Sequence, residues 1–209
     1  MVKVSASRSR AYVAAPREDV CLGFANTLYW RGSATPTETL HRARDLLDWA
    51  EKEGGADPAL ARACAGAWES EKEADQAFET ALGLRETIYR LFAGVADSGK
   101  PPAEEVARLN TGLGMVPARA RLTQLGAGAA WQFEASPTVL SLLAPVLWSA
   151  GDLLTSARLG RVRACDNPQC RFLFLDDSKA GTRRWCSMSS CGNRAKAHRH
   201  YLRHRGDER

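Results

Sequence analysis

CDNPQC at residues 165–170 and CSMSSC at residues 186–191 are two cysteine pairs with the same spacing, four residues between the cysteines of each pair. Fifteen residues separate the pairs. A single pair of this kind would be weak evidence, because the commoner zinc spacing has two intervening residues, but its repetition favours a four-thiolate zinc site. Zinc suits such a site because it accepts tetrahedral geometry and has no redox chemistry. The spacing therefore predicts one structural Zn²⁺ with four ligands: Cys165, Cys170, Cys186 and Cys191.

The residues around the pairs predict the fold of this module. Residues 161–164 and 171–175 have the apolar, β-favouring character of short strands, and residues 193–205 contain no helix breaker before Gly206. A knuckle, a hairpin and a helix that carries the last ligand form a treble-clef arrangement, and a helix N-terminus favours a thiolate. We therefore expect residues 158–209 to form a treble-clef-like zinc finger. Four reduced cysteines without metal are the alternative, although so polar a segment has little else to hold it together.

The two remaining cysteines, Cys21 and Cys64, are isolated in helix-like sequence, and we expect them to be buried as small hydrophobic residues. Residues 1–15 lack the apolar run of a secretory signal, and no stretch approaches the roughly 18 apolar residues of a membrane span. We therefore expect a cytoplasmic protein with no membrane partner. In that reducing compartment paired cysteines bind metal more often than they form disulfides.

Residues 1–157 predict a mainly helical domain with one β-hairpin, an α+β arrangement. Periodicity and breakers predict helices over residues 18–31, 39–54, 58–95 (with a break near Gly66 or Gly83), 103–113 and 137–154. Around the Gly126-Ala127-Gly128 turn the apolar period becomes two, which predicts a hairpin of residues 120–125 and 129–135.

Charge is distributed unequally between these two parts. Residues 1–157 carry 16 Lys and Arg against 19 Asp and Glu, whereas residues 158–209 carry 13 against 5, a net charge of +8. A basic helix beside a zinc module is suited to contact phosphates, so we predict nucleic-acid binding, with DNA the expected form. The candidate contact residues are Arg183, Arg184, Arg194, Lys196, Arg199 and Arg203. Alternatively, these arginines offset the negative charge of a four-thiolate site, or the finger is an adaptor that docks a protein partner.

The sequence Cys191-Gly192-Asn193-Arg194, preceded by residues 184–188 (RWCSM), resembles the CGNR zinc finger family. Residues 174–176 (FLD) and 178–179 (SK) are similar to the same pattern, and residues 24–27 (FANT) with Arg31 resemble the helical domain found ahead of that finger, labelled a stress-induced transcription regulator. Gly23 departs from the pattern, which has an acidic residue there. The resemblance covers nearly the whole chain and implies a zinc-binding finger and a role in transcription regulation during stress response.

Asn26, Thr27 and Arg31 are polar residues in an aromatic-rich stretch of the helical domain. They could line a pocket for a small-molecule effector that biases the finger. Alternatively, they cap or cross-link helices in a structural domain, since buried polar side chains generally have hydrogen-bonding partners. The sequence leaves both roles open, with a slight preference for the second.

We expect no enzymatic activity. His200 and His204 have the spacing of a helical metal pair, but no glutamate lies between them and a third ligand is missing. The chain has no phosphate loop, nucleophile elbow or dinucleotide fingerprint. A homodimer formed through the helical domain would enlarge a small binding footprint, although no heptad pattern indicates one.

Overall fold

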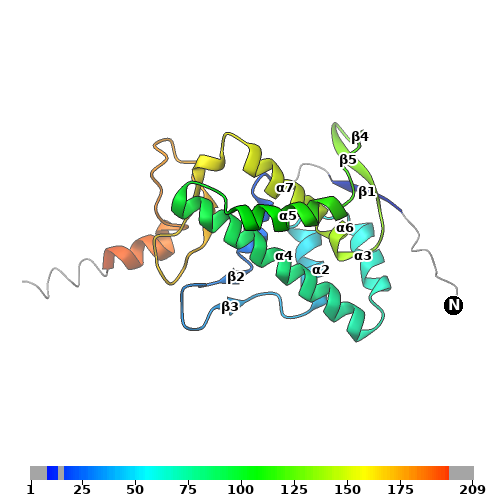
Figure 1. Ribbon diagram of the computed structural model, residues 1–209, viewed down its shortest axis with the longest axis horizontal. Coiled ribbons are helices and arrows are strands. Elements are labelled where there is room, and N and C mark those ends of the chain that lie inside the picture. Colours follow the sequence, from blue (N-terminus) through cyan, green and yellow to red (C-terminus); the bar gives the residue numbers. More distant parts are fainter. Residues whose placement is uncertain (1–8, 14–16, 198–209) are drawn as a thin grey trace, which may run out of the picture.

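The computed structural model describes residues 9–13 and 17–197 (Figure 1). About half of the chain is helical, and the described strands form small antiparallel sheets. This confirms the predicted mainly helical fold with a β-hairpin. The helices are α1 (Val20–Ala25), α2 (Ala43–Lys52), α3 (Pro58–Ala67), α4 (Glu71–Ser98), α5 (Ala103–Met115), α6 (Val139–Leu142) and α7 (Ala144–Thr155).

Helix α4 is the long central helix against which α1, α2, α5 and α6 pack (Figure 1). It begins with a capping box, in which Ser70 and Glu73 satisfy each other's backbone N–H groups, and ends at Gly99 in the left-handed conformation (φ 75°). The predicted break near Gly66 occurs at residues 68–70, whereas Gly83 lies within an unbroken helix. The buried face of α4 places Phe78, Ile88, Leu91, Phe92 and Val95 in the main hydrophobic core.

A sheet with strand order β1-β5-β4 lies at one end of the helical domain. The predicted hairpin is confirmed as β4 (Arg121–Leu125) and β5 (Gly128–Ala135), and its turn has Gly126 at φ 57°. The sequence pattern did not predict β1 (Ser9–Val13), which pairs with the other edge of β5 and buries Ala11 and Val13. An alternating strand of only five residues gives a weak signal without its partner.

The predicted helix over residues 18–31 is wrong beyond Ala25. Asn26 ends α1, and β2 (Leu28–Tyr29) then pairs with β3 (Thr37–Glu38). Trp30 follows with a φ of 54°, which is uncommon for a residue other than glycine. The chain therefore leaves the helix and forms a loop over residues 30–36 that reaches the cysteine-rich module.

The strands predicted around the first cysteine pair are confirmed as β6 (Val162–Ala164) and β7 (Leu173–Leu175), which pair antiparallel. Val162, Leu173 and Leu175 are buried in the same core as α1 and α4. The core thus continues across the predicted boundary at residues 157/158. No helix in the described part of the chain is both long and apolar enough to cross a membrane.

Candidate metal centre

The four predicted ligands lie together, with their sulfur atoms all within 4.8 Å of one another. The Sγ atom of Cys186 is 3.7 Å from that of Cys170 and 3.8 Å from that of Cys191. In a tetrahedral zinc site with Zn–S bonds of about 2.3 Å, sulfur atoms lie about 3.8 Å apart. These separations exclude disulfides, in which the sulfurs are about 2.05 Å apart. The donors and their spacing therefore fit a tetrahedral metal ion.

Different local structures present the two cysteine pairs. Cys165 follows β6 and its N–H donates to Phe172 O, while the N–H of Cys170 donates to Asn167 O in a tight turn. In the second pair, Cys191 lies in a π-helical turn, Met188–Gly192, which continues into helical residues 193–197. The part of the predicted helix over residues 193–205 that the structure describes is therefore confirmed, and the remainder lies outside the described residues.

Aromatic side chains shield the cluster from water. Cys165, Cys170 and Cys191 are buried and Cys186 is half-buried. They pack with one another and with Phe174, and against Trp30, Phe172 and Trp185. Four protein thiols in such a shell leave no position for a substrate, so the arrangement suits a structural ion.

Hydrogen bonding lowers the pKa of one thiol of the cluster, and burial raises the pKa of another. The hydrogen bond from Cys186 lowers the pKa of Cys170 to about 5, whereas burial raises the pKa of Cys165 to about 11. The Nδ2 atom of Asn167 lies 3.6 Å from Cys191 Sγ, to which it donates. A metal cation would replace the thiol protons, because thiolates are the ligand form of cysteine.

Residues 18–157 match the family model described as "Putative stress-induced transcription regulator", under the name ABATE, which covers well over half of the chain. The chain belongs to the ABATE family. Residues 161–204 match the CGNR zinc finger, so the resemblance seen in the sequence is confirmed for both parts. A comparison with curated proteins gives no match.

The loop between the cysteine pairs of the CGNR finger is organised by Asp176. This buried carboxylate accepts hydrogen bonds from Ser178 N, Ser178 Oγ and Arg183 N. The bonds from Ser178 lower its pKa, so the carboxylate stays ionised. Asp176 and Asn167 were not predicted as site residues, although an Asp followed two positions later by Ser, and an Asn before Pro, are typical turn signals.

The predicted basic residues have different surroundings. Arg183 donates to the carbonyl groups of Trp185 and Cys186 and lies 4.5 Å from the Phe174 ring centroid. Arg184 pairs with Asp166, and Arg194 lies over the Trp30 ring at 4.8 Å. Lys196 is exposed in the first turn of the final helix. Arg199 and Arg203 lie outside the described residues.

The structure gives internal partners to the residues that the sequence suggested for an effector pocket. Asn26 hydrogen-bonds the backbone of Leu173, and Thr27 Oγ1 donates to Phe24 O. Arg31 pairs bidentately with Glu86 and lies 3.8 Å from the Tyr89 ring centroid. These contacts are those of the structural alternative, and they give no support to an effector site there.

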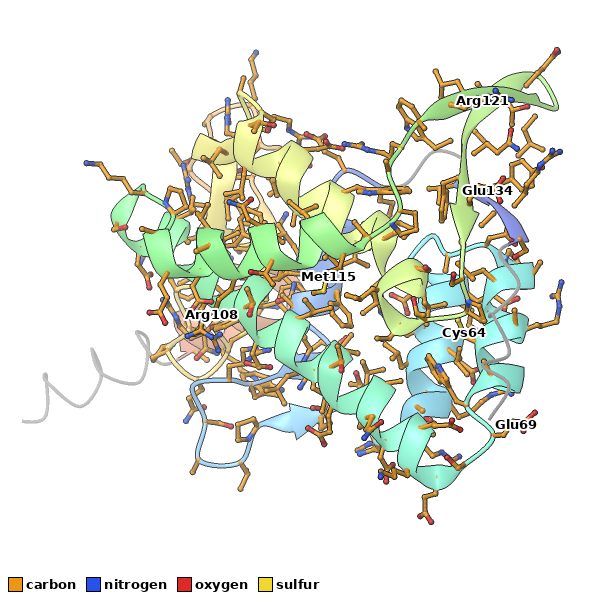
Figure 2. The ribbon with its side chains drawn as sticks, turned by 45° about the vertical axis from the view of Figure 1, so that its right-hand side comes forward. Cys64, Glu69, Arg108, Met115, Arg121 and Glu134 are labelled. Carbon is orange, nitrogen blue, oxygen red and sulfur yellow. The ribbon has the colours of Figure 1, made fainter. Side chains whose placement is uncertain are left out.

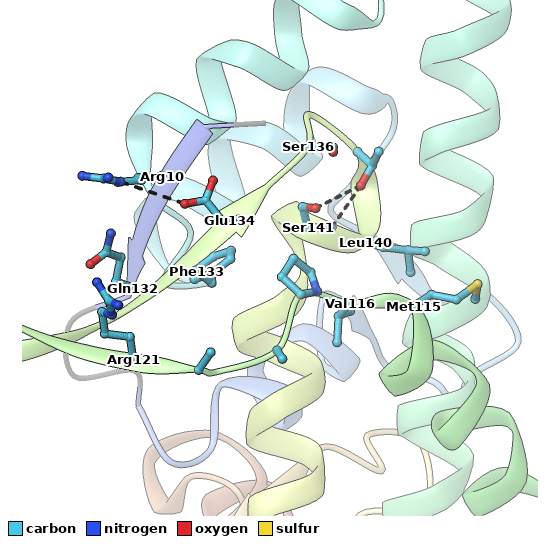
Figure 3. Close-up of a pocket in the computed structure, with 14 residues that line it drawn as sticks. Arg10, Met115, Val116, Arg121, Gln132, Phe133, Glu134, Ser136, Leu140 and Ser141 are labelled. Carbon is cyan, nitrogen blue, oxygen red and sulfur yellow. Dashed lines mark hydrogen bonds and ion pairs between the residues drawn. The ribbon is translucent and has the colours of Figure 1, made fainter. Parts of the chain in front are cut away.

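A cavity of about 770 Å³ lies instead beside the β-sheet of the ABATE domain (Figure 3). Its lining includes Arg10, Glu134, Met115 and Leu140. Figure 2 shows Arg121 and Glu134 on the hairpin, and Figure 1 places this hairpin and the CGNR finger at opposite ends of the molecule.

Cys21 and Cys64 are fully buried, which confirms their predicted role as small hydrophobic residues.

Proposed function

We propose that this ABATE-family protein is a zinc-dependent, nucleic-acid-binding transcription regulator that acts in stress response. The observation that carries the proposal is the four-thiol cluster with tetrahedral sulfur spacing. Two of its cysteines lie in the basic segment of residues 183–196. In this proposal the CGNR finger presents positive charge to the phosphates of DNA, and the metal holds that segment in place.

One Zn²⁺ is the proposed ion. Four thiolates in a closed tetrahedral set favour zinc over harder cations such as Mg²⁺ or Ca²⁺. The ion would cross-link the two cysteine pairs and supply no reaction chemistry, because no coordination position is free. With the β6–β7 hairpin and the helix that follows Cys191, the metal would complete a treble-clef arrangement.

The proposed phosphate contacts centre on the start of the final helix. Lys196 is exposed there without a described hydrogen bond, and Arg194 is exposed above Trp30. Arg199 and Arg203 follow at helical spacing in the sequence. Arg183 and Arg184 have intramolecular partners, so we assign them a smaller share of the affinity.

A protein-docking adaptor is the second candidate. It is favoured by the internal contacts of Arg183 and Arg184, which fit charge compensation, and by exposed Met188 beside the second cysteine pair. In that case apolar side chains rather than Lys196 would determine binding. Neither candidate assigns an enzymatic reaction to the cluster.

The salt dependence of DNA binding tests the proposal. Fluorescence anisotropy of the zinc-loaded protein with a labelled duplex should show affinity that falls steeply with salt. Lys196→Ala should reduce the slope of log K against log salt by about 0.9, the contribution of one phosphate contact. Lys72→Ala, an exposed lysine on α4, is the matched control and should leave the slope unchanged. Absence of binding at about 50 mM salt would refute the proposal and favour the adaptor.

A further inference from the structure

The ABATE domain holds the first cysteine pair directly, beginning with the side chain of Asn26. Its Nδ2 donates to Leu173 O at 2.7 Å and its Oδ1 accepts from Leu173 N at 2.9 Å. Both bonds are buried, and Leu173 begins the strand that follows Cys170. A side chain at the end of α1 thus satisfies both backbone groups of a residue in the finger, as a neighbouring strand would.

The loop after β2 contacts the same knuckle through its backbone. The N–H of Gly32 donates to Gln169 O at 3.1 Å. A Cβ atom at Gly32 would lie 1.8 Å from Pro168 O, so only glycine permits this approach without displacement. The turn between Cys165 and Cys170 therefore lies against the ABATE domain.

Helix α4 supplies a third attachment. Asp97 accepts two hydrogen bonds of 2.7 Å from Arg171, and the hydroxyl of Tyr89 donates to Arg171 O at 3.3 Å. Tyr29 also stacks on Phe172 with ring centroids 5.9 Å apart. Together with the burial of Leu173 and Leu175, these contacts attach the turn and strand beside Cys165 and Cys170 to the ABATE domain through protein groups.

The second cysteine pair has much weaker attachments. In residues 183–197 only Cys191 and Gly192 are buried. The segment contacts the first knuckle through two bonds between Asp166 and Arg184, one of them from Asp166 N to Arg184 O, and through the bond from Asn167 to Cys191. Its Arg183 N also donates to Asp176, just after β7. Its described contact with the ABATE domain is Arg194 over Trp30. Arg183, Arg184 and Arg194 are exposed, so water screens these contacts, and they hold the segment less firmly than the buried contacts hold the first pair.

We propose that the ABATE domain preassembles the first half of the metal site, with Asn26 as its positioning residue, and that the metal latches the second half onto it. Loss of metal would then release residues 183–197, with their basic side chains, while residues 162–175 stay folded. An isolated zinc finger behaves differently, since it unfolds completely without metal. This inference rests on the metal binding of the proposed function and adds the way in which metal occupancy regulates the same surface.

Hydrogen exchange of the full-length protein, with zinc and after chelation, tests the unequal halves. The backbone amides of β6 and β7 should keep their protection after chelation, whereas those of residues 184–192 should lose it. Simultaneous loss of protection in both segments would overturn the proposal, and so would retention of protection in both.

The role of Asn26 is tested by cobalt titration, followed by the thiolate-to-metal absorption bands. Asn26→Ala should weaken Co²⁺ binding about 10-fold, as loss of a supporting hydrogen bond does in other metal sites. It should also expose the Leu173 amide to exchange in the metal-free protein. Asn110→Ala, on the exposed side of α5, is the matched control and should change neither measurement. Unchanged cobalt affinity in Asn26→Ala would contradict the positioning role.

A second variant, at another contact between the ABATE domain and the first cysteine pair, keeps the proposal testable if Asn26→Ala does not fold. Gly32→Ala should separate the loop from Pro168 and weaken Co²⁺ binding, whereas Gly114→Ala, where a Cβ meets nothing within 4 Å, should not. These measurements contain no nucleic acid. Protein that shows the expected exchange pattern but binds no DNA would contradict the proposed function alone. Protein that binds DNA but loses both segments together would contradict only this inference.

Discussion

Asn167 lies within the first cysteine pair but reaches a ligand of the second. Its Nδ2 donates to Cys191 Sγ, and its Oδ1 accepts from Gln169 N at 3.1 Å. One side chain therefore shapes the turn between Cys165 and Cys170 and stabilises negative charge on the opposite pair.

We predict that Asn167→Ala lowers zinc affinity about 10-fold, because hydrogen bonds to ligands typically contribute 10- to 100-fold. Asn167→Asp keeps the acceptor for Gln169 but places a carboxylate beside the thiolates, so it should lower the affinity further. Competition with a chromophoric chelator measures both. Equal affinities in the two variants and the wild type would show that this contact does not support the metal.

Arg85, which is buried, forms an ion pair with half-buried Glu38 through hydrogen bonds of 2.7 and 2.6 Å. Burial alone would raise the pKa of Glu38, but the bonds from Arg85 and from the backbone N–H of Leu40 outweigh it and lower the pKa. The pair therefore stabilises the fold fully above the unfolded value of about 4.3, and this stabilisation is lost as pH falls through the lower folded value.

Glu38→Gln should lower the free energy of unfolding at pH 7 by about 2 kcal/mol, the contribution of hydrogen bonds to a charged group. The difference from wild type should shrink as the pH falls below about 4. Urea denaturation across pH measures it, with Glu79→Gln on the exposed face of α4 as the control. A difference that is constant with pH would contradict the assignment.

At the residue scale the sequence predicted the four cysteines, because their spacing repeats, and they lie together as expected. It could not decide the role of Asn26, because its partner Leu173 lies 147 positions away in the chain. Gly32 gave no signal either, since its constraint comes from the carbonyl of Pro168 across the fold.

Two glycines of helix α4, one in its interior and one at its C-terminal end, have opposite conformational requirements. Gly83 lies inside the helix with open space around its Cβ position, whereas Gly99 ends the helix at φ 75°. Gly83→Ala should therefore raise the free energy of unfolding by about 0.5–1 kcal/mol. Gly99→Ala should lower it by about 1 kcal/mol, because a Cβ atom is strained in the left-handed conformation. Thermal or urea unfolding of the pair measures both signs, and a shared sign would contradict the helix bounds.

At the element scale, the sequence predicted helix and hairpin boundaries correctly where the interacting residues are close in sequence. The predicted helix start at residue 58, where Asp57 is the N-cap, and the hairpin at Gly126 are confirmed because capping and turn chemistry are local. The end of α1 at Ala25 was missed, since the continuing apolar pattern through Leu28 and Tyr29 fits a helix as well as a strand. Tertiary contacts with β7 and β3 decide between them.

Among the described residues, the main hydrophobic core runs from the ABATE domain into the β6–β7 hairpin, beside a smaller cluster around the cysteines. Charge asymmetry in the sequence indicated two functional units but carried no information on this shared packing. A chain that ends at residue 157 would lose the buried side chains of Val162, Leu173 and Leu175. At about 1.5–3 kcal/mol for each side chain, it should be less stable than the full chain by several kcal/mol. Equal denaturant midpoints would show instead that the two parts fold independently.

The central claim is that metal held by the four cysteines controls nucleic-acid binding. The most direct test measures the affinity of the wild-type protein for a labelled DNA duplex at fixed salt, first zinc-loaded, then after chelation, and again after zinc is restored. We predict strong binding, a loss of at least about 10-fold on chelation, and full recovery with zinc, since ordering of the basic segment depends on the ion. Equal affinity in all three states would contradict the claim.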